Sequence, residues 1–254
     1  MSTRLRLFVL WVGAVGLGLL IAIAIWRLPG FGHYPGPYGD MLNSLAPYER
    51  QVTNVVTAIN FDYRALDTLG EEFILFAAVS GLVLLLRGKR GESAGEPPNP
   101  PDERALVPRS DALRWASLGF IAVINLFGSY MVLHGHLTPG GGFQGGAILG
   151  IASILVYVAF DYRSYRKTTP KEWIEVVEAI GAGSYALVGL GAIFAGGAFL
   201  QNVLPLGERG HLFSGGTIPL INFAVGLEVA AGFALLFLEF LEETRTPKPE
   251  DIES

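Results

Sequence analysis

The most regular feature of the chain is a series of long apolar runs separated by short polar segments. A helix needs about 20 mostly apolar residues to cross the hydrocarbon core of a bilayer. Six runs meet this requirement, at residues 5–28, 66–86, 113–133, 142–160, 173–200 and 218–241. The second run is long enough only if Asp67, Glu71 and Glu72 lie inside the helix. The pattern predicts an all-α, polytopic membrane protein with six transmembrane helices.

Lysine and arginine residues are distributed unevenly between the polar segments. If the N-terminus is cytoplasmic, 14 of the 18 Lys and Arg residues lie in inner segments and 4 in outer ones. Cytoplasmic loops carry the excess of positive residues in membrane proteins. We therefore expect both termini to be cytoplasmic and the turn between the third and fourth runs to face outward.

Two polar segments suggest how the chain is organised. Residues 88–111 are rich in Pro, Gly and charge, which is typical of a flexible linker. This linker separates a two-helix region, residues 1–87, from a four-helix region, residues 112–241. Residues 242–254 form a polar tail that we expect to be disordered and cytoplasmic.

The outer segment between the first two runs has a pattern of its own. Val52, Val55, Val56 and Ile59 recur at helical spacing, which predicts a short amphipathic helix lying on the membrane surface. The aromatic, Gly- and Pro-rich residues 30–39 before it predict a turn at the interface.

The composition excludes several kinds of protein. Only 16% of the residues are charged, against about 25% in a soluble domain. The chain has no cysteine and four histidines, which leaves no disulfide, thiolate metal site or Cys nucleophile. A net charge of −5 does not suit nucleic-acid binding. Neither a phosphate-binding loop nor a nucleophile elbow is present, so we expect no enzymatic activity and no bound cofactor or metal.

Glu228 lies near the middle of the last apolar run, in NFAVGLEVAAGF. A charge at this depth costs at least about 2.5–3.5 kcal/mol, so an ionisable residue here is a functional candidate. Burial favours its neutral form, which can release and rebind a proton. The alternative is a structural hydrogen bond to a neighbouring helix, with Asn222 as one partner.

Three acids lie at the start of the second run, in ALDTLGEEF. Asp67 and Glu71 are four residues apart and share a helix face, which suits a proton or cation site. Glu71 and Glu72 point about 100° apart, so one can face a polar interior while the other lies near the surface. We place Glu71 in the path and interpret Asp67 as an acid favoured by the helix dipole.

The turn between the third and fourth runs reads HGHLTPGGGFQGG. His134 and His136 are two residues apart, which does not suit a two-His metal site, but His136 can relay protons at the outer surface. Pro139 stops a helix, and the glycines of the turn allow positive φ. Gly142, Gly146 and Gly150 are spaced for close helix packing. A tight helical hairpin alone would explain most of this turn.

The fifth run begins with two further acids and continues with many small residues. We interpret Glu175 and Glu178 as solvated acids near the inner surface. The glycines of this run favour packing against partner helices over contact with lipid alone.

The glycine-rich turn and the apolar helix after it resemble the MnhB family, which forms one of the subunits of Mrp-type multisubunit Na⁺/H⁺ antiporters. This resemblance covers about residues 113–241 and includes NFAVGLEVAAG. The earlier stretch INFDYRALDTLGEEF resembles the C-terminal end of the large subunit of these antiporters, and also the MbhE-like subunit of membrane-bound hydrogenases. The chain is therefore expected to be a natural fusion of two such parts, joined within residues 88–111.

The resemblance implies a role inside a large complex in the plasma membrane of a prokaryote. The expected partners are complex-I-like antiporter subunits and small membrane subunits, and the complex would exchange Na⁺ for H⁺, both as cargo. The resemblance assigns cation transport to Glu71 and importance in the turn to His136, Pro139 and Phe143. The expected ion or proton path comprises Asp67, Glu71, Glu72, His136 and Glu228, and the expected structural turn comprises Gly135, Pro139, Gly140, Gly141, Gly142 and Phe143.

Two alternatives remain open at this stage. The chain would play the same role in a hydrogenase-type respiratory complex, where electron transfer drives ion pumping. It would otherwise be a structural scaffold whose glycine-rich helices hold active subunits together.

Overall fold

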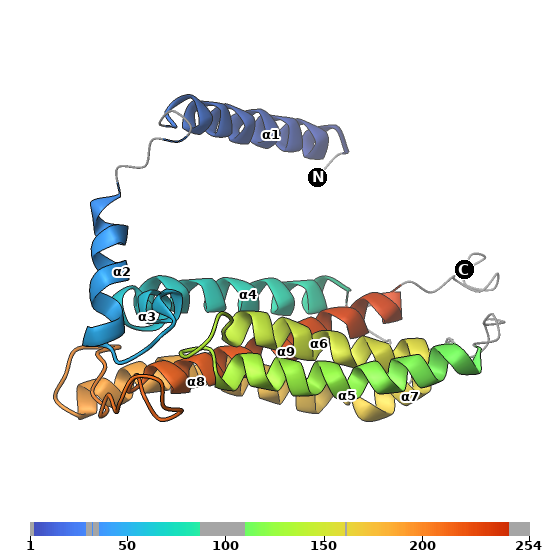
Figure 1. Ribbon diagram of the computed structural model, residues 1–254. Coiled ribbons are helices and arrows are strands. Elements are labelled where there is room, and N and C mark those ends of the chain that lie inside the picture. The colour runs from blue at the N-terminus through green and yellow to red at the C-terminus, as the bar shows by residue number, and fades with distance from the viewer. Residues whose placement is uncertain (1–2, 29–31, 33–35, 87–109, 161, 244–254) are drawn as a thin grey trace, which may run out of the picture. The chain divides into compact units, whose positions relative to one another are not determined.

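The computed structural model describes residues 3–28, 32, 36–86, 110–160 and 162–243, and their regular structure is helical throughout (Figure 1). Six long helices are α1 (Thr3–Trp26), α4 (Ala65–Leu86), α5 (Asp111–Leu133), α6 (Gly142–Ala159), α8 (Lys171–Phe194) and α9 (Ile218–Glu243). The short elements are α2 (Pro37–Glu49), α3 (Val55–Ala58), the π-helix η1 (Ile59–Tyr63) and α7 (Tyr162–Thr168). All six long helices are apolar enough to cross a membrane. The predicted all-α fold with six spans is confirmed.

The chain divides into two units, residues 1–40 and residues 41–254. The first unit contains α1, whose mean hydropathy of 2.6 is the highest of the six spans. The second unit contains the other five spans and all the residues discussed below.

Helix α9 is the centre of the second unit. It contacts α4, α5, α6 and α8, which run alongside it in Figure 1. Of its most apolar stretch 61% is buried, against 33% or less for each of the other spans. Side chains on several faces of α9 are therefore sheltered from lipid, and polar groups on it need partners or a function.

Glycines allow α6 to approach α9 closely. A Cβ at Gly146 would lie 2.7 Å from the carbonyl oxygen of Gly226, and one at Gly150 would lie 2.7 Å from the Cβ of Phe233. A Cβ at Gly145 would lie 2.8 Å from the backbone N of Val132 on α5. The predicted close packing through small residues is thus present, and it fixes α6 between α5 and α9.

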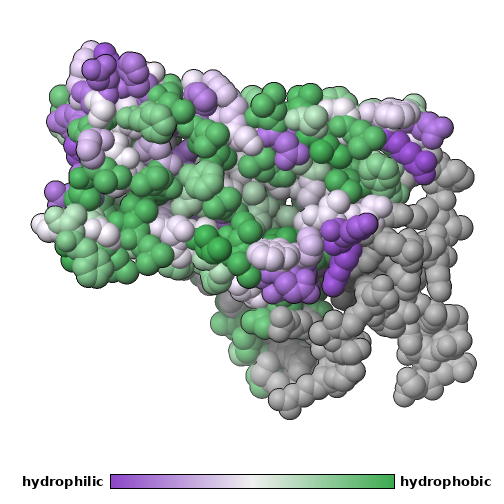
Figure 2. Space-filling view, turned by 90° about the horizontal axis from the view of Figure 1, so that it is seen from below, coloured by the Kyte–Doolittle hydropathy of each residue, from purple (hydrophilic) through white to green (hydrophobic). Residues whose placement is uncertain are grey.

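The outer surface of the bundle is largely apolar. Exposed residues include Phe120, Leu126 and Phe127 on α5 and Ile180 and Leu187 on α8. Figure 2 shows broad hydrophobic areas interrupted by smaller hydrophilic groups. Such a surface fits lipid or neighbouring membrane helices and does not suit water.

The prediction for the outer segment before α4 is wrong. Instead of one amphipathic helix on the membrane surface, the chain forms α3 and the π-helical turn η1. Val52 and Ala58 are fully buried in the core beside α9, so this segment packs into the bundle. The sequence pattern does not predict α2, because its residues combine prolines, a glycine and polar side chains that are typical of a turn.

Two boundaries also differ from the predicted ones. Helix α8 ends at Phe194, six residues before the expected end, and Gly196 then adopts a positive φ of 86°. Helix α5 ends at Leu133, so Pro139 lies in the turn and does not itself stop the helix. The predicted linker, apart from its last two residues, and the tail from residue 244 lie outside the described residues.

Candidate functional site

The glycine-rich turn joins α5 to α6 and is fixed to α9 by one amide. The Oδ1 of Asn222 accepts a hydrogen bond of 2.6 Å from the backbone N–H of Gly142, and its Nδ2 donates to the carbonyl of Val132. Gly140 has a φ of 137°, which favours glycine. A Cβ at Gly135 would lie 2.8 Å from the Cα of Gly141. The turn therefore requires small residues and is held rigidly against α9.

The segment before α4 closes over the same turn. The amide of Asn54 donates to the carbonyls of Gly135 (2.7 Å) and Thr138 (3.0 Å), and also contacts that of Gly140. The hydroxyl of Thr57 donates to Gly135 at 2.6 Å. These contacts satisfy carbonyls that would otherwise be buried without a partner.

His136 belongs to this closed structure. It is 1% exposed, and its Nε2 lies 3.1 Å from the carbonyl of Leu212, which requires a proton on Nε2. Its own carbonyl accepts hydrogen bonds from the backbone N–H groups of Thr53 and Asn54. Burial lowers the pKa of His136 below 6.5, and the hydrogen bond to Leu212 only partly offsets that effect. A buried, neutral imidazole suits a residue that holds the turn in its conformation.

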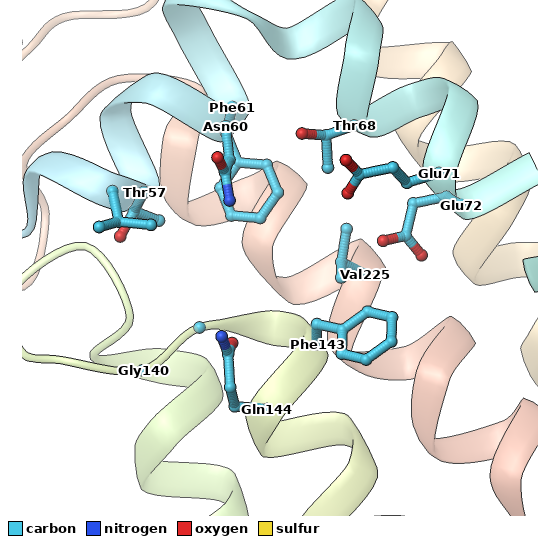
Figure 3. Close-up of a pocket in the computed structure, with 12 residues that line it drawn as sticks. Thr57, Asn60, Phe61, Thr68, Glu71, Glu72, Gly140, Phe143, Gln144 and Val225 are labelled. Atoms are coloured by element: carbon cyan, nitrogen blue, oxygen red, sulfur yellow. The ribbon is translucent and has the colours of Figure 1, made fainter. Parts of the chain in front are cut away.

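A cavity of about 240 Å³ lies below the turn, between η1, α4, α6 and α9. Its walls combine polar and apolar groups: Val56, Thr57, Asn60, Phe61, Thr68, Glu71, Glu72, Gly140, Gly141, Phe143, Gln144 and Val225. Figure 3 shows the side chains of Glu71 and Glu72 converging on this space from α4, with Phe143 and Gln144 facing them from α6. Two acids and two amides around a cavity of this size suit water and small cations.

The two adjacent acids of α4 differ sharply in environment. Glu72 is 2% exposed, whereas Glu71 is exposed at the rim of the cavity. The expectation that one faces inward and the other outward is confirmed, but the inward residue is Glu72 rather than Glu71. Asp67 shares the exposed face with Glu71 and forms an ion pair with Arg64.

Behind the cavity, Glu72 is the first of three buried acids on three different helices. Glu228 on α9 is 1% exposed and interacts with Glu72 on one side and Glu178 of α8 on the other. Glu72 and Glu228 can hydrogen-bond each other when one of them carries a proton, and no other group bonds the oxygens of Glu228, Oε2 of Glu72 or Oε1 of Glu178. Buried polar atoms are almost always hydrogen-bonded, so four such oxygens in one place require an explanation.

Two predictions about these acids are corrected by the structure. Glu178 is predicted to be solvated, but it is 3% exposed because α8 turns that face toward Gly232 of α9. The alternative bond between Glu228 and Asn222 is not formed, because Asn222 is used by the turn. The prediction that Glu228 is sheltered from lipid is confirmed.

Several groups that sequence reasoning missed also lie in buried polar contacts. Lys171 and Glu239 form an ion pair between the N-terminal end of α8 and the C-terminal end of α9, with Glu239 4% exposed. Asn54 and Asn222 hold the turn. No spacing rule identifies these residues, since their partners are 68 to 90 positions away in the sequence. Among the described residues, no group of three or more acids and histidines is arranged to hold a metal ion.

Comparison with known proteins shows which proteins this chain resembles. Residues 112–235 match a family model described as a domain related to the MnhB subunit of the Na⁺/H⁺ antiporter. A protein of Rhizobium meliloti named as a probable K⁺/H⁺ antiporter A/B subunit is 30% identical over 221 residues, covering 78% of this chain and 21% of the relative.

Two solved structures are similar over nearly the whole chain. One belongs to the membrane-bound sulfane sulfur reductase, an archaeal respiratory membrane complex, with a TM-score of 0.69, 31% identity, and coverage of 93% of this chain and 98% of that one. The other belongs to the Mrp complex of Dietzia sp. DQ12-45-1b, with a TM-score of 0.68, 26% identity, and coverage of 98% and 27%. The chain therefore spans about a quarter of the length of the Rhizobium meliloti relative and of the Mrp complex chain.

The fold, the apolar surface and the buried acids define a multi-pass membrane protein of prokaryotic type. Within that class, residues 112–235 form a domain related to the MnhB subunit of the Na⁺/H⁺ antiporter, as the sequence predicts.

Proposed function

We propose that the chain is a non-enzymatic membrane subunit of a multisubunit cation/proton antiporter, in which it provides part of the ion or proton path. The observation that carries this proposal is the cavity lined by Glu72, behind which the carboxyl group of Glu228 is buried with no hydrogen-bond partner other than a neighbouring acid. The relatives named as antiporter subunits support the assignment of the complex. Other antiporter-type subunits are then its partners.

In this proposal the cavity is the outer entrance of the path. Glu72 is the eighth residue of α4 and Glu228 the eleventh of α9, so they lie about 10 and 15 Å below the helix ends. A proton entering through the cavity binds first Glu72 and then Glu228. Glu71 at the rim attracts cations, and Asp67 is held beside it by Arg64.

His136 and the glycine turn have a structural part in the same proposal. Gly140 and Gly141 of the turn line one side of the cavity, and Phe143 and Gln144 line it from the start of α6. Na⁺ and H⁺ pass through as cargo and the chain itself holds no cofactor. In this proposal the carboxyl groups bind and release protons, and the turn determines the shape of the cavity.

The two-part origin of the chain is also a proposal. We place a region like the end of the large antiporter subunit in residues 1–87 and an MnhB-like region in residues 112–241, joined by residues 88–111. The A/B name of the Rhizobium meliloti relative, which matches 78% of this chain, supports a fused arrangement.

The test is proton and Na⁺ flux in proteoliposomes that contain the native complex. Glu228→Gln removes the proton-binding oxygen and keeps the size of the side chain, so we expect Na⁺-dependent proton flux to fall at least about tenfold. Glu208→Gln, at an exposed position of the outer loop, is the matched control. Unchanged flux for Glu228→Gln in a normally assembled complex would contradict the path and support the scaffold.

A respiratory complex is a second candidate, favoured by one observation. The sulfane sulfur reductase chain is matched over 98% of its length, so it has the same extent as this chain, which the antiporter chains do not. The proposed path is the same in that setting, but electron transfer drives it. Purification of the native complex decides between them, because redox subunits with Fe–S clusters co-purify only in the respiratory case.

A further inference from the structure

The series of buried acids continues beyond Glu228. Glu178 continues the series on α8, and Glu175, half-buried one turn away, acts electrostatically on Glu178. Lys171 is four residues before Glu175 on the same face of α8 and forms an ion pair with Glu239 of α9. Each member of the series therefore lies on the same helix face as the next or interacts with it across a helix contact.

The series descends steadily through the bundle. From the outer ends of their helices, Glu72 and Glu228 lie about 10 and 15 Å deep, Glu178 about 24 Å and Glu239 about 32 Å. With the orientation that the Lys and Arg distribution predicts, Lys171 and Glu239 lie at the cytoplasmic side. The acids thus extend over about 22 Å of the hydrocarbon core, which is about 30 Å thick.

We propose that Glu178, Glu175 and the Lys171–Glu239 pair form the inner half of a proton path that connects Glu228 with the cytoplasm. This inference rests on the proposed function, because it extends the path that begins at the outer cavity. It adds residues that neither the sequence pattern nor the resemblance assigns to transport.

The geometry around Glu178 supports this role. A Cβ placed on Gly232 would lie 3.5 Å from Oε1 of Glu178, so this oxygen faces the space that the missing side chain leaves on α9. Gly232 is one helical turn after Glu228 on α9, so Glu178 is the next acid after Glu228 along the proposed path. Oε1 of Glu178 is buried without a partner and is free to bind a proton or a water molecule.

The surroundings suit protons better than metal cations. Val79, Val83, Ile174, Ala231 and Leu235 form an apolar cluster around this part of the bundle. A cation would need several oxygens at once, but within the described ranges no three acids or histidines are arranged to hold one. Single carboxyl groups spaced along the membrane depth can instead pass a proton directly or through one water.

Each transfer is a simple proton exchange. The O–H bond of the protonated carboxyl breaks, a new O–H bond forms on the next carboxylate, and the negative charge moves back by one residue. At the inner end, a proton arriving on Glu239 removes the charge that holds Lys171, so the ion pair opens and the proton is released to water. No oxidant, reductant or other reactant is required.

The experiment uses the native complex in proteoliposomes and compares Glu178→Gln, Glu178→Asp and the control Glu172→Gln, which alters an exposed acid of the same helix. We expect Glu178→Gln to lower proton flux at least about tenfold, Glu178→Asp to restore a substantial part of it, and Glu172→Gln to leave it unchanged. Infrared difference spectra after a pH change should also lose a carboxylic-acid band in Glu178→Gln.

The outcomes separate this inference from the function it rests on. If Glu228→Gln abolishes flux while Glu178→Gln retains it and keeps the infrared band, the inner half is wrong and the outer half stands. If neither variant changes flux, both are wrong. If Glu178→Gln does not assemble, the double variant Lys171→Met with Glu239→Gln is measured, and normal proton flux in that variant overturns the inference.

Discussion

The bundle contains two buried polar regions that differ in how their hydrogen bonds are completed. In the glycine-rich turn, Asn222, Asn54 and Thr57 bind backbone groups at 2.6 to 3.0 Å, and only Nδ1 of His134 and Nδ1 of His136 stay without a partner among its buried side-chain atoms. In the middle of the bundle, Glu72, Glu178 and Glu228 have four buried carboxyl oxygens that no group other than a neighbouring acid bonds. A satisfied polar network makes a structure rigid, whereas an unsatisfied carboxyl is retained at a cost that function has to justify. This difference supports the structural role that we propose for the turn and the proton handling that we propose for the acids.

The largest expected effect is a change in the packing beneath the turn. Gly146→Ala places a Cβ 2.7 Å from a backbone oxygen of α9, which cannot move independently of its helix. We expect a loss of about 3 kcal/mol and little assembled complex on native gels. Gly183→Ala is the control, because nothing lies within 4 Å of a Cβ there. Equal assembly of both variants would mean that close α6–α9 packing does not hold the site together.

Removing the amide that fixes the turn should have the next largest effect. Asn222→Ala leaves the N–H of Gly142 buried without its partner, at a cost of about 1–3 kcal/mol. The thermal unfolding temperature of the purified complex should fall, while flux per assembled complex changes little. Asn125→Ala, which removes an exposed amide bonded within its own helix, provides the control. A large loss of flux without a loss of stability would contradict the structural assignment of the turn.

Acidic pH should loosen the turn through His136. Its pKa is lowered in the fold, so between that value and about 6.5 the opened turn binds a proton that the closed turn does not. The stability of the turn is therefore complete above about pH 6.5 and decreases as the pH falls. The protection factors against hydrogen exchange of the Thr53 and Asn54 amides, which donate to His136, should fall accordingly. His136→Gln should flatten this pH dependence, and exposed His211→Gln should not.

The smallest expected effect distinguishes the two adjacent acids of α4. Glu71→Gln removes an exposed charge at the rim, where solvent weakens electrostatic interactions to about 0.2–1 kcal/mol. We expect the Na⁺ concentration for half-maximal flux to rise about two- to fivefold, with maximal flux retained. Glu72→Gln should instead lower maximal proton flux. The reverse pattern would show that the exposed acid, favoured by the family resemblance, carries the proton.

The sequence predicts the spans better than their rotation about their own axes. Apolar length alone locates all six helices, because each must cross the same thickness. It does not tell which side of a helix faces its neighbours, since a membrane helix is apolar on every side. The choice between Glu71 and Glu72 and the burial of Glu178 both depend on that rotation. The arrangement of the helices around α9 determines which acids are buried, and the local spacing of residues does not encode that arrangement.

The candidate site shows the same limit. Glu228 is recognisable because a charge in mid-membrane is rare, and the glycine turn is recognisable as a motif. Asn54, Lys171 and Glu239 are not, because their importance arises from contacts between distant segments. The prediction for the outer segment fails for a different reason, since a helical apolar pattern fits both a membrane surface and a protein core.

The central claim is that water reaches the carboxyl groups of Glu72, Glu228 and Glu178 inside the bundle. A high-resolution cryo-electron microscopy map of the native complex in a lipid nanodisc tests it most directly. The account predicts ordered waters that link the three side chains to the outer cavity and continue toward Lys171. Dry, closely packed side chains around all three, with no water between them, would contradict it and leave the chain a structural brace.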